Sequence, residues 1–131
     1  MTFDGFFVAG FDGPAPDGWV WNALPQPFKI DGVRPDIWGV DSTGTVAVGE
    51  AKTADDVDTR HTRQQLRMYT RLRRRQRPEL CRVYVAVPRS SVFALDRVLV
   101  DVHMIRASHV VRMHVPDCLL ESLESYAGDY A

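Results

Sequence analysis

Two carboxylates and one ammonium group stand in a single stretch of this chain, VRPDIWGVDSTGTVAVGEAK at residues 33–52. The carboxylates are Asp36, which follows Pro35, and Glu50, and the ammonium group is that of Lys52. Two negative charges held close together are unfavourable unless a cation lies between them. Hard divalent cations prefer oxygen ligands such as carboxylates. If the fold brings these side chains together, they predict a divalent-metal site.

The elements around these residues read as a β-hairpin. The sequence DSTG at 41–44 is typical of a turn, and the segments on either side of it are enriched in strand-forming residues. A three-residue loop that ends with Gly44 in the left-handed conformation sets Asp36 opposite Glu50. Directly opposed residues share a face, with Cβ atoms roughly 5 Å apart. Lys52 lies two residues beyond Glu50 and therefore shares that face.

A simpler interpretation of the same residues is a solvated strand face, because Glu-x-Lys is common on exposed strands. The lysine content favours a functional site over a solvated strand face. The chain has two lysines, Lys29 and Lys52, against fourteen arginines. In a chain that otherwise uses arginine, a lysine at this position indicates a requirement for a compact ammonium group.

Charge changes sharply after the hairpin. Residues 31–58 hold seven acids and two bases, whereas residues 60–77 hold eight arginines, one histidine and no acid. We expect a helix from residue 56 or 58 to about residue 75, followed by Pro78. An acidic pocket beside a basic segment suits an enzyme that handles phosphates, although a charge run alone also fits a solvated helix. The arginines that we expect to bind nucleic acid are Arg60, Arg63, Arg67, Arg71 and Arg74.

The same helix carries His61, Gln65 and Tyr69 at a spacing of four, which places them in one stripe. Gln65 and Tyr69 offer neutral donors to a phosphate or to a water molecule. Tyr69 also fits an apolar stripe with Leu66 and Leu72, so a core position with its hydroxyl at the edge is equally open. His61 near a helix start fits a plain surface position as well as a site.

The chain as a whole predicts one α/β domain over residues 1–131, with a mixed central sheet flanked by helices. We expect residues 1–27 to be irregular, with one short strand or helical turn near 6–8 or 19–24. Further predicted elements are strands at 28–31, 82–87 and 110–115 and helices at 92–101 and 117–127. The apolar side of the helix at 92–101 is predicted to hold Phe93, Leu95, Val98 and Leu99.

Composition is that of an ordinary soluble protein, with 45% hydrophobic and 25% charged residues and a net charge of −1. The first residues lack a basic, apolar signal sequence, and no apolar run is long enough to span a bilayer. Cys81 and Cys118 match no metal-ligand spacing, which favours a reduced pair. These observations predict a cytoplasmic location and no membrane partner.

The chain resembles the PD-(D/E)XK nuclease superfamily in three motifs: Pro35-Asp36, Glu50-Ala51-Lys52 and the Gln-x-x-x-Tyr sequence at 65–69. The likeness covers about residues 28–87. It implies a restriction-endonuclease-like core over about 28–115 and a metal-dependent nuclease that acts on DNA, with a homodimer expected.

The resemblance also implies roles for individual residues. Asp36, Glu50 and the main-chain carbonyl of Ala51 would hold Mg²⁺ or Mn²⁺. Lys52 would position or activate the attacking water, and Gln65 and Tyr69 would line the helix side of the site. The arginine-rich segment would hold the DNA strand.

One feature departs from that family. Its members usually supply a Glu from a helix before the hairpin, whereas no Glu precedes Glu50 in this chain. The upstream acids are Asp4, Asp12, Asp17 and Asp31, of which Asp31 lies just before the motif. Either an Asp such as Asp31 substitutes, the partner subunit contributes the acid, or the first helix is lost. A catalytically inactive module that binds nucleic acid or a partner protein is therefore the alternative expectation.

Overall fold

A computed structural model describes residues 4–12, 24–30, 32–73 and 80–116. The strands in these ranges are β1 (Phe7–Phe11), β2 (Ile37–Val40), β3 (Val46–Ala51), β4 (Arg82–Pro88) and β5 (Val110–Val115). The helices are α1 (Ala54–Val57), α2 (Arg60–Tyr69) and α3 (Val92–Asp101), with a 3₁₀ turn, η3 (Arg89–Ser91), before α3. Asp17, Asp31, Arg74, Cys118 and the helix predicted at 117–127 lie outside the described residues.

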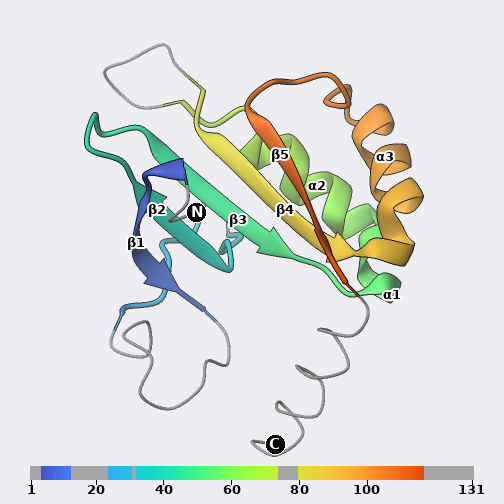
Figure 1. Cartoon of the computed structure of the whole chain (residues 1–131), viewed down its shortest axis with the longest axis horizontal. Helices are drawn as coiled ribbons and strands as arrows, with labels where there is room; N and C mark the ends of the chain where they lie inside the picture. The colour runs from blue at the N-terminus through green and yellow to red at the C-terminus, as the bar shows by residue number, and fades with distance from the viewer. Residues whose placement is uncertain (1–3, 13–23, 31, 74–79, 117–131) are drawn as a thin grey trace, which may run out of the picture.

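The strands form one mixed sheet in the order β1-β2-β3-β4-β5. β1, β2 and β3 pair antiparallel, whereas β3, β4 and β5 pair parallel. Figure 1 shows α1, α2 and α3 on one face of this sheet. We call the opposite face the open face. The predicted α/β class with a mixed, helix-flanked sheet is therefore confirmed, and no helix within the described ranges is long and apolar enough to cross a membrane.

The hairpin register agrees with the prediction from its turn. Gly44 adopts a φ of 84°, and the amide of Asp41 donates to the carbonyl oxygen of Thr45 at 3.0 Å. The ladder then runs down to Ile37 opposite Gly49. Asp36 and Glu50 follow as the next opposed positions at the end of the hairpin.

A hydrophobic core lies between the helices and the sheet. It joins Val48 on β3 and Val85 on β4 to Leu66 and Tyr69 on α2 and to Leu95 on α3, all of them 0 or 1% exposed. The predicted apolar stripe of α2 is confirmed, since Leu72 also packs against this core. Burial of each large apolar side chain contributes roughly 1.5–3 kcal/mol, so this layer fixes how α2 lies on β3.

The single helix predicted over residues 56 or 58 to 75 is wrong in extent, because α1 and α2 are separate. α2 ends at Tyr69, where the chain turns back toward the sheet. The carbonyl oxygen of Leu72 accepts a hydrogen bond from the amide of Cys81 at 2.9 Å, and this tertiary contact outweighs the helix propensity of the arginines. Arg71 therefore lies beyond the helix.

The short strand that was one option near residues 6–8 is confirmed as the edge strand β1, which extends to Phe11. Two other expectations need correction. The described part of the strand predicted at 28–31, residues 28–30, forms no strand: Gly32 adopts a φ of 83° and the chain folds back in an isolated bridge between Ile30 and Val33. Phe93 is 80% exposed, because the buried stripe of α3 runs through Leu95, Val98 and Leu99 and leaves Phe93 on the opposite side.

Gly10 is required by the close approach of β1 to Trp38. A Cβ atom at this position would lie 2.4 Å from Nε1 of Trp38 and 2.6 Å from its Cδ1. We expect Gly10→Ala to lower the free energy of unfolding by about 1–3 kcal/mol, because the bulky ring must shift. Urea unfolding measures this. An unchanged free energy of unfolding in Gly10→Ala would contradict the steric explanation.

Candidate active site

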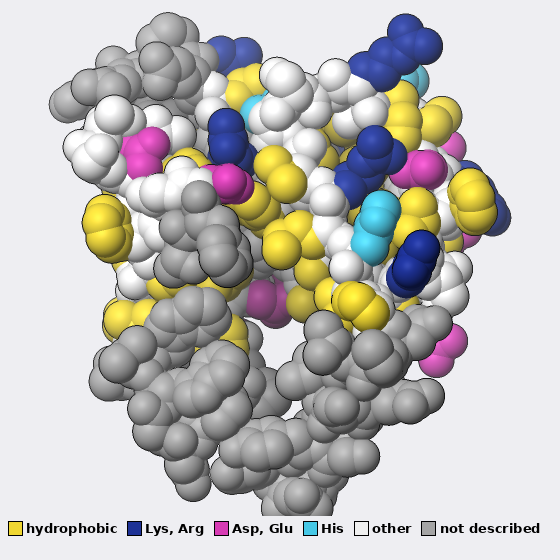
Figure 2. All heavy atoms as spheres, in the orientation of Figure 1, with side chains coloured by type: hydrophobic (Ala, Val, Ile, Leu, Met, Phe, Trp, Pro, Cys, Tyr) yellow, Lys and Arg dark blue, Asp and Glu magenta, His cyan; other side chains and the backbone are white. Residues whose placement is uncertain are grey.

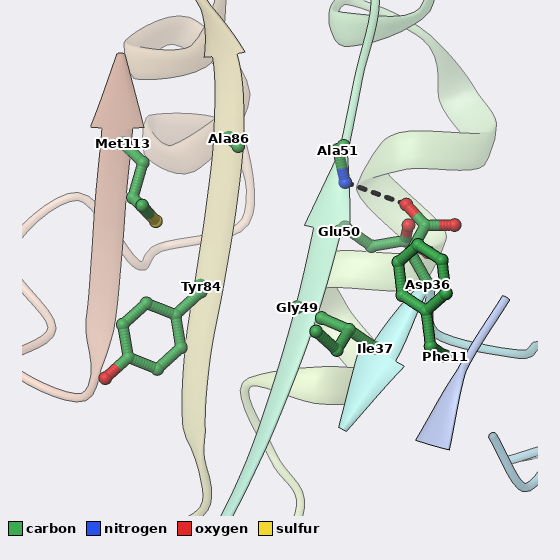
Figure 3. A pocket seen from close by; sticks show the side chains of 9 residues that line it. All are labelled: Phe11, Asp36, Ile37, Gly49, Glu50, Ala51, Tyr84, Ala86 and Met113. Atoms are coloured by element: carbon green, nitrogen blue, oxygen red, sulfur yellow. Dashed lines mark hydrogen bonds between the residues drawn. The ribbon is translucent and has the colours of Figure 1, made fainter. Parts of the chain in front are cut away.

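The two carboxylates of the hairpin meet where β2 and β3 end. Glu50 is 6% exposed and points to the helix side of the sheet, as Val48 does. Asp36 lies in the bend before β2, and its Oδ2 accepts a hydrogen bond from the amide of Ala51 at 2.8 Å. Figure 3 shows this bond and the carboxylate of Asp36 close to that of Glu50. The hairpin register has therefore brought both acids to one point.

Helix α2 supplies the other side of the site. The helix begins after Thr59, whose hydroxyl accepts from the amide of Thr62 at 3.1 Å as an N-cap. One turn later, Nε2 of Gln65 donates to Oε1 of Glu50 at 2.8 Å. The hydroxyl of Tyr69 donates to the same oxygen at 3.1 Å. Both helix residues therefore position Glu50.

Gln65 also links Glu50 to the lysine. Nζ of Lys52 donates to Oε1 of Gln65, while Nε2 of Gln65 donates to Glu50. Because an ammonium group only donates and a carboxylate only accepts, the Gln65 amide has one orientation that satisfies both neighbours. Lys52, Gln65 and Glu50 form a continuous chain of hydrogen bonds from the half-buried ammonium group to the buried carboxylate.

The environment of Glu50 favours its neutral form. Burial raises the pKa of Glu50 to about 8, and the adjacent carboxylate of Asp36 adds to this rise. The charge of Lys52 and the Tyr69 hydroxyl oppose it. The ionised form of Glu50 is thus disfavoured beside a second carboxyl group, the condition that a bound cation would relieve.

The donor set fits a hard divalent ion. Two carboxylates lie together, and Ala51, whose carbonyl is the third expected ligand, borders the same cavity as Asp36 and Glu50. Among the described residues no group of three or more His, Cys, Asp or Glu side chains is placed to hold a metal. Mg²⁺ commonly binds through one or two carboxylates with water and substrate phosphate completing its shell.

The basic residues are placed less uniformly than expected. Arg63 is engaged by Asp58 and Asp101, each at 2.7 Å, and so joins α2 to α3. Arg67 and Arg71 are exposed and border a groove of about 440 Å³. This groove, which we call the arginine groove, is completed by Ile30, Gln64, Met68 and Leu72. Arg60 and His61 are exposed on the first turn of α2.

Among the upstream acids, Asp31, the expected substitute, lies outside the described residues, whereas Asp12 lies near the site. β1 pairs with β2, and the amide of Asp12 donates to the carbonyl oxygen of Asp36 at 2.7 Å. Asp12 is thus directly across from Asp36, although its carboxylate accepts from Gln26 at 3.3 Å. Asp4 lies elsewhere, bonded to the hydroxyl of Tyr84. The apolar run at 6–8, where a short strand was one of the expected options, was the feature that could have indicated Asp12.

The Tyr69 hydroxyl favours the ionised form of Glu50, so Tyr69→Phe is expected to move the pKa of Glu50 above about 8. The ring remains to fill the core, and we expect a loss of about 1 kcal/mol in the free energy of unfolding. The ¹³C shift of the Glu50 carboxyl against pH measures the titration. Tyr84→Phe, whose hydroxyl contacts Asp4 instead, is the matched control. An unchanged or lowered pKa would contradict the assigned role.

Comparison with known proteins found no match among family models, curated proteins or solved structures. The geometry of the site therefore carries the functional argument, and the DNA partner and the homodimer stay predictions.

Proposed function

We propose that this protein is a metal-dependent nuclease that hydrolyses phosphodiester bonds in DNA on a restriction-endonuclease-like core. The observation that supports this most is the meeting of Asp36, Glu50 and Lys52 at the end of one hairpin, with Glu50 held by two donors of α2. Two carboxylates and an ammonium group at one point combine cation binding with stabilisation of negative charge. Hydrolysis of a phosphodiester needs both.

Each side chain has a separate task in this proposal. Asp36 and Glu50 would hold Mg²⁺ or Mn²⁺, together with the carbonyl of Ala51. The bound ion would lower the pKa of a water molecule and neutralise charge on the phosphate oxygens. The ammonium group of Lys52 stabilises the attacking hydroxide or the charge that builds on the phosphate. Gln65 keeps that ammonium group beside Glu50 through its amide.

The arginine groove is the proposed contact for the DNA backbone. Arg67 and Arg71 have no carboxylate partner among the residues that the structure describes, in contrast to Arg63. Their guanidinium groups can each make two parallel hydrogen bonds to a phosphate. α2 thus presents Gln65 and Tyr69 to the site on one side and these arginines to solvent on another.

An inactive module on the same fold is the second candidate. Two observations favour it: the chain has no Glu before Glu50, and within the described ranges no third acid joins Asp36 and Glu50 in a group that could hold a metal. In this case the arginine groove would bind nucleic acid or an acidic partner without cleavage.

Calorimetric titration with Mn²⁺ and a cleavage assay on labelled DNA together separate the two candidates. The nuclease proposal expects Mn²⁺ binding that is lost in Asp36→Asn and cleavage that requires Mg²⁺ or Mn²⁺. Asp55→Asn, at an exposed acid on α1, should leave both unchanged. DNA binding with no metal binding and no cleavage would favour the inactive module. Asp12→Asn then tests whether the acid across from Asp36 contributes to metal affinity.

A further inference from the structure

A cavity opens on the open face of the sheet, and Asp36 and Glu50 are among its lining residues, although the Glu50 carboxylate itself points to the helix side. It has a volume of about 210 Å³ and is lined by residues of all five strands. Its floor consists of the small residues Gly49, Ala51 and Ala86. Since these side chains barely rise above the strands, they leave a shallow, flat-bottomed hollow in an otherwise filled sheet face. Figure 2 shows this side of the molecule, where hydrophobic side chains gather over the sheet.

Larger side chains form the walls of the cavity. Phe11 and Ile37 stand on one side, where they pair across β1 and β2. Tyr84 and Met113 stand on the other side, as Figure 3 shows. The hydroxyl of Tyr84 donates a hydrogen bond to Asp4, so the part of Tyr84 that lines the cavity is the carbon surface of its ring. Met113 is 43% exposed, and its side of the cavity is open to solvent.

Asp36 and Glu50 border this apolar space. The Asp36 carboxylate, bonded to the amide of Ala51 at the end of the strands, links this space to the proposed metal site. A planar aromatic group attached to a phosphate that a divalent ion holds there would have the apolar floor and the ring of Phe11 within reach. A nucleobase has this shape, and its faces stack on aromatic and apolar side chains. A base inside a duplex cannot use the cavity, because it must first leave its stack and its partner.

Resting on the proposed nuclease function, we propose that this cavity binds one unpaired nucleobase next to the scissile phosphate. The substrate is then a single strand, a frayed end or an extruded nucleotide rather than an intact duplex. The base lies against Phe11 and the floor, and its hydrogen-bonding edge faces the open side. The arginine groove lies on the helix side of the sheet and is lined by α2. It would bind the backbone phosphates of the same strand.

The test compares affinities for a labelled single strand and for a blunt hairpin duplex of the same sequence. Ca²⁺ replaces Mg²⁺, so that binding is measured by fluorescence anisotropy without depending on cleavage. Phe11→Ala removes the stacking wall, and Ala86→Leu fills the floor from β4. Each is expected to weaken single-strand binding roughly 5- to 150-fold and to leave duplex binding within about twofold. Phe93→Ala, at an exposed phenylalanine on α3, is the matched control and should change neither affinity.

Single strands that carry one abasic site provide a measurement on the unaltered protein, in case a variant fails to fold. Loss of affinity confined to one or two abasic positions supports the cavity. Equal affinity for every abasic strand overturns it, as does an equal effect of Phe11→Ala on duplex and single strand. A matched RNA strand that depends on Phe11 in the same way also supports it and identifies RNA as a second source of the base.

These outcomes separate the cavity from the nuclease proposal. Phe11-dependent binding of single strands without cleavage in Mg²⁺ contradicts the nuclease alone. Metal-dependent cleavage of intact duplex that is unaffected by Phe11→Ala and Ala86→Leu contradicts the cavity alone.

Discussion

Lys52→Ala is expected to abolish DNA cleavage, with a rate at least about 10²–10³-fold below that of the unaltered protein. Its ammonium group is bonded to Gln65, which in turn bonds Glu50, so its loss removes the charge that stabilises the transition state. Lys52→Met keeps most of the side-chain length and should be as inactive. Lys52→Arg should not restore the rate, because a planar fork does not occupy the place of a compact ammonium group.

The controls for this expectation come from the same chain. Lys29, the other lysine, is exposed, and Lys29→Ala should cleave normally. DNA affinity of the Lys52 variants should persist, because the arginine groove is unaltered. Glu50→Ala should also lose cleavage. Single-turnover kinetics with labelled DNA measures the rates, and full cleavage by Lys52→Ala in Mg²⁺ would rule out the assigned role.

The part of the site that could be predicted from the sequence is the part set by local geometry. The turn fixes the register of the hairpin, and the register fixes the positions of Asp36, Glu50 and Lys52. The four-residue spacing also places Gln65 and Tyr69 on one stripe. That stripe faces the hairpin because Leu66 and Tyr69 are the buried side of α2.

The rest depends on contacts between distant segments. Gln65 and Tyr69 were expected to meet phosphate or water, but both donate to Glu50, since packing of α2 on β3 brings them to that carboxylate. Arg63 was expected to bind DNA, whereas it is engaged by the nearby Asp58 and by Asp101, which is far from it in the sequence. The edge strand β1, with Phe11 and Asp12, forms through pairing with β2 and has little local pattern of its own.

The site also links folding to pH. In the metal-free protein, the free energy of unfolding should fall as pH rises from about 4.5 to about 8. The pKa of Glu50 is near 4.5 when exposed and about 8 in the folded state. Between these two pH values the folded state binds a proton that the unfolded state does not. The stabilisation from this proton is therefore complete below the pKa of the unfolded state and is lost as the pH rises through the pKa of the folded state. The loss is on the order of 3–5 kcal/mol if Glu50 alone is responsible.

Glu50→Gln is expected to remove this dependence and to make the metal-free protein more stable than the unaltered one at pH 8. The carboxamide has the shape of the protonated acid: its oxygen can accept from Gln65 and Tyr69, and its amino group can donate to Asp36. A neutral group at this buried position therefore avoids the cost of an ionised carboxylate beside another one. The same substitution should abolish cleavage, because it removes one of the two proposed metal ligands.

Urea unfolding at several pH values measures the effect, and the difference between the two proteins isolates Glu50 from all other titrating groups. Asp55→Asn is the control and should follow the unaltered protein. Mn²⁺ should raise the free energy of unfolding of the unaltered protein at pH 8, since an ion that binds only the folded state stabilises it. It should leave that of Glu50→Gln unchanged. A parallel pH dependence in both proteins would show that Glu50 is not the buried, proton-binding acid on which the proposed metal site depends.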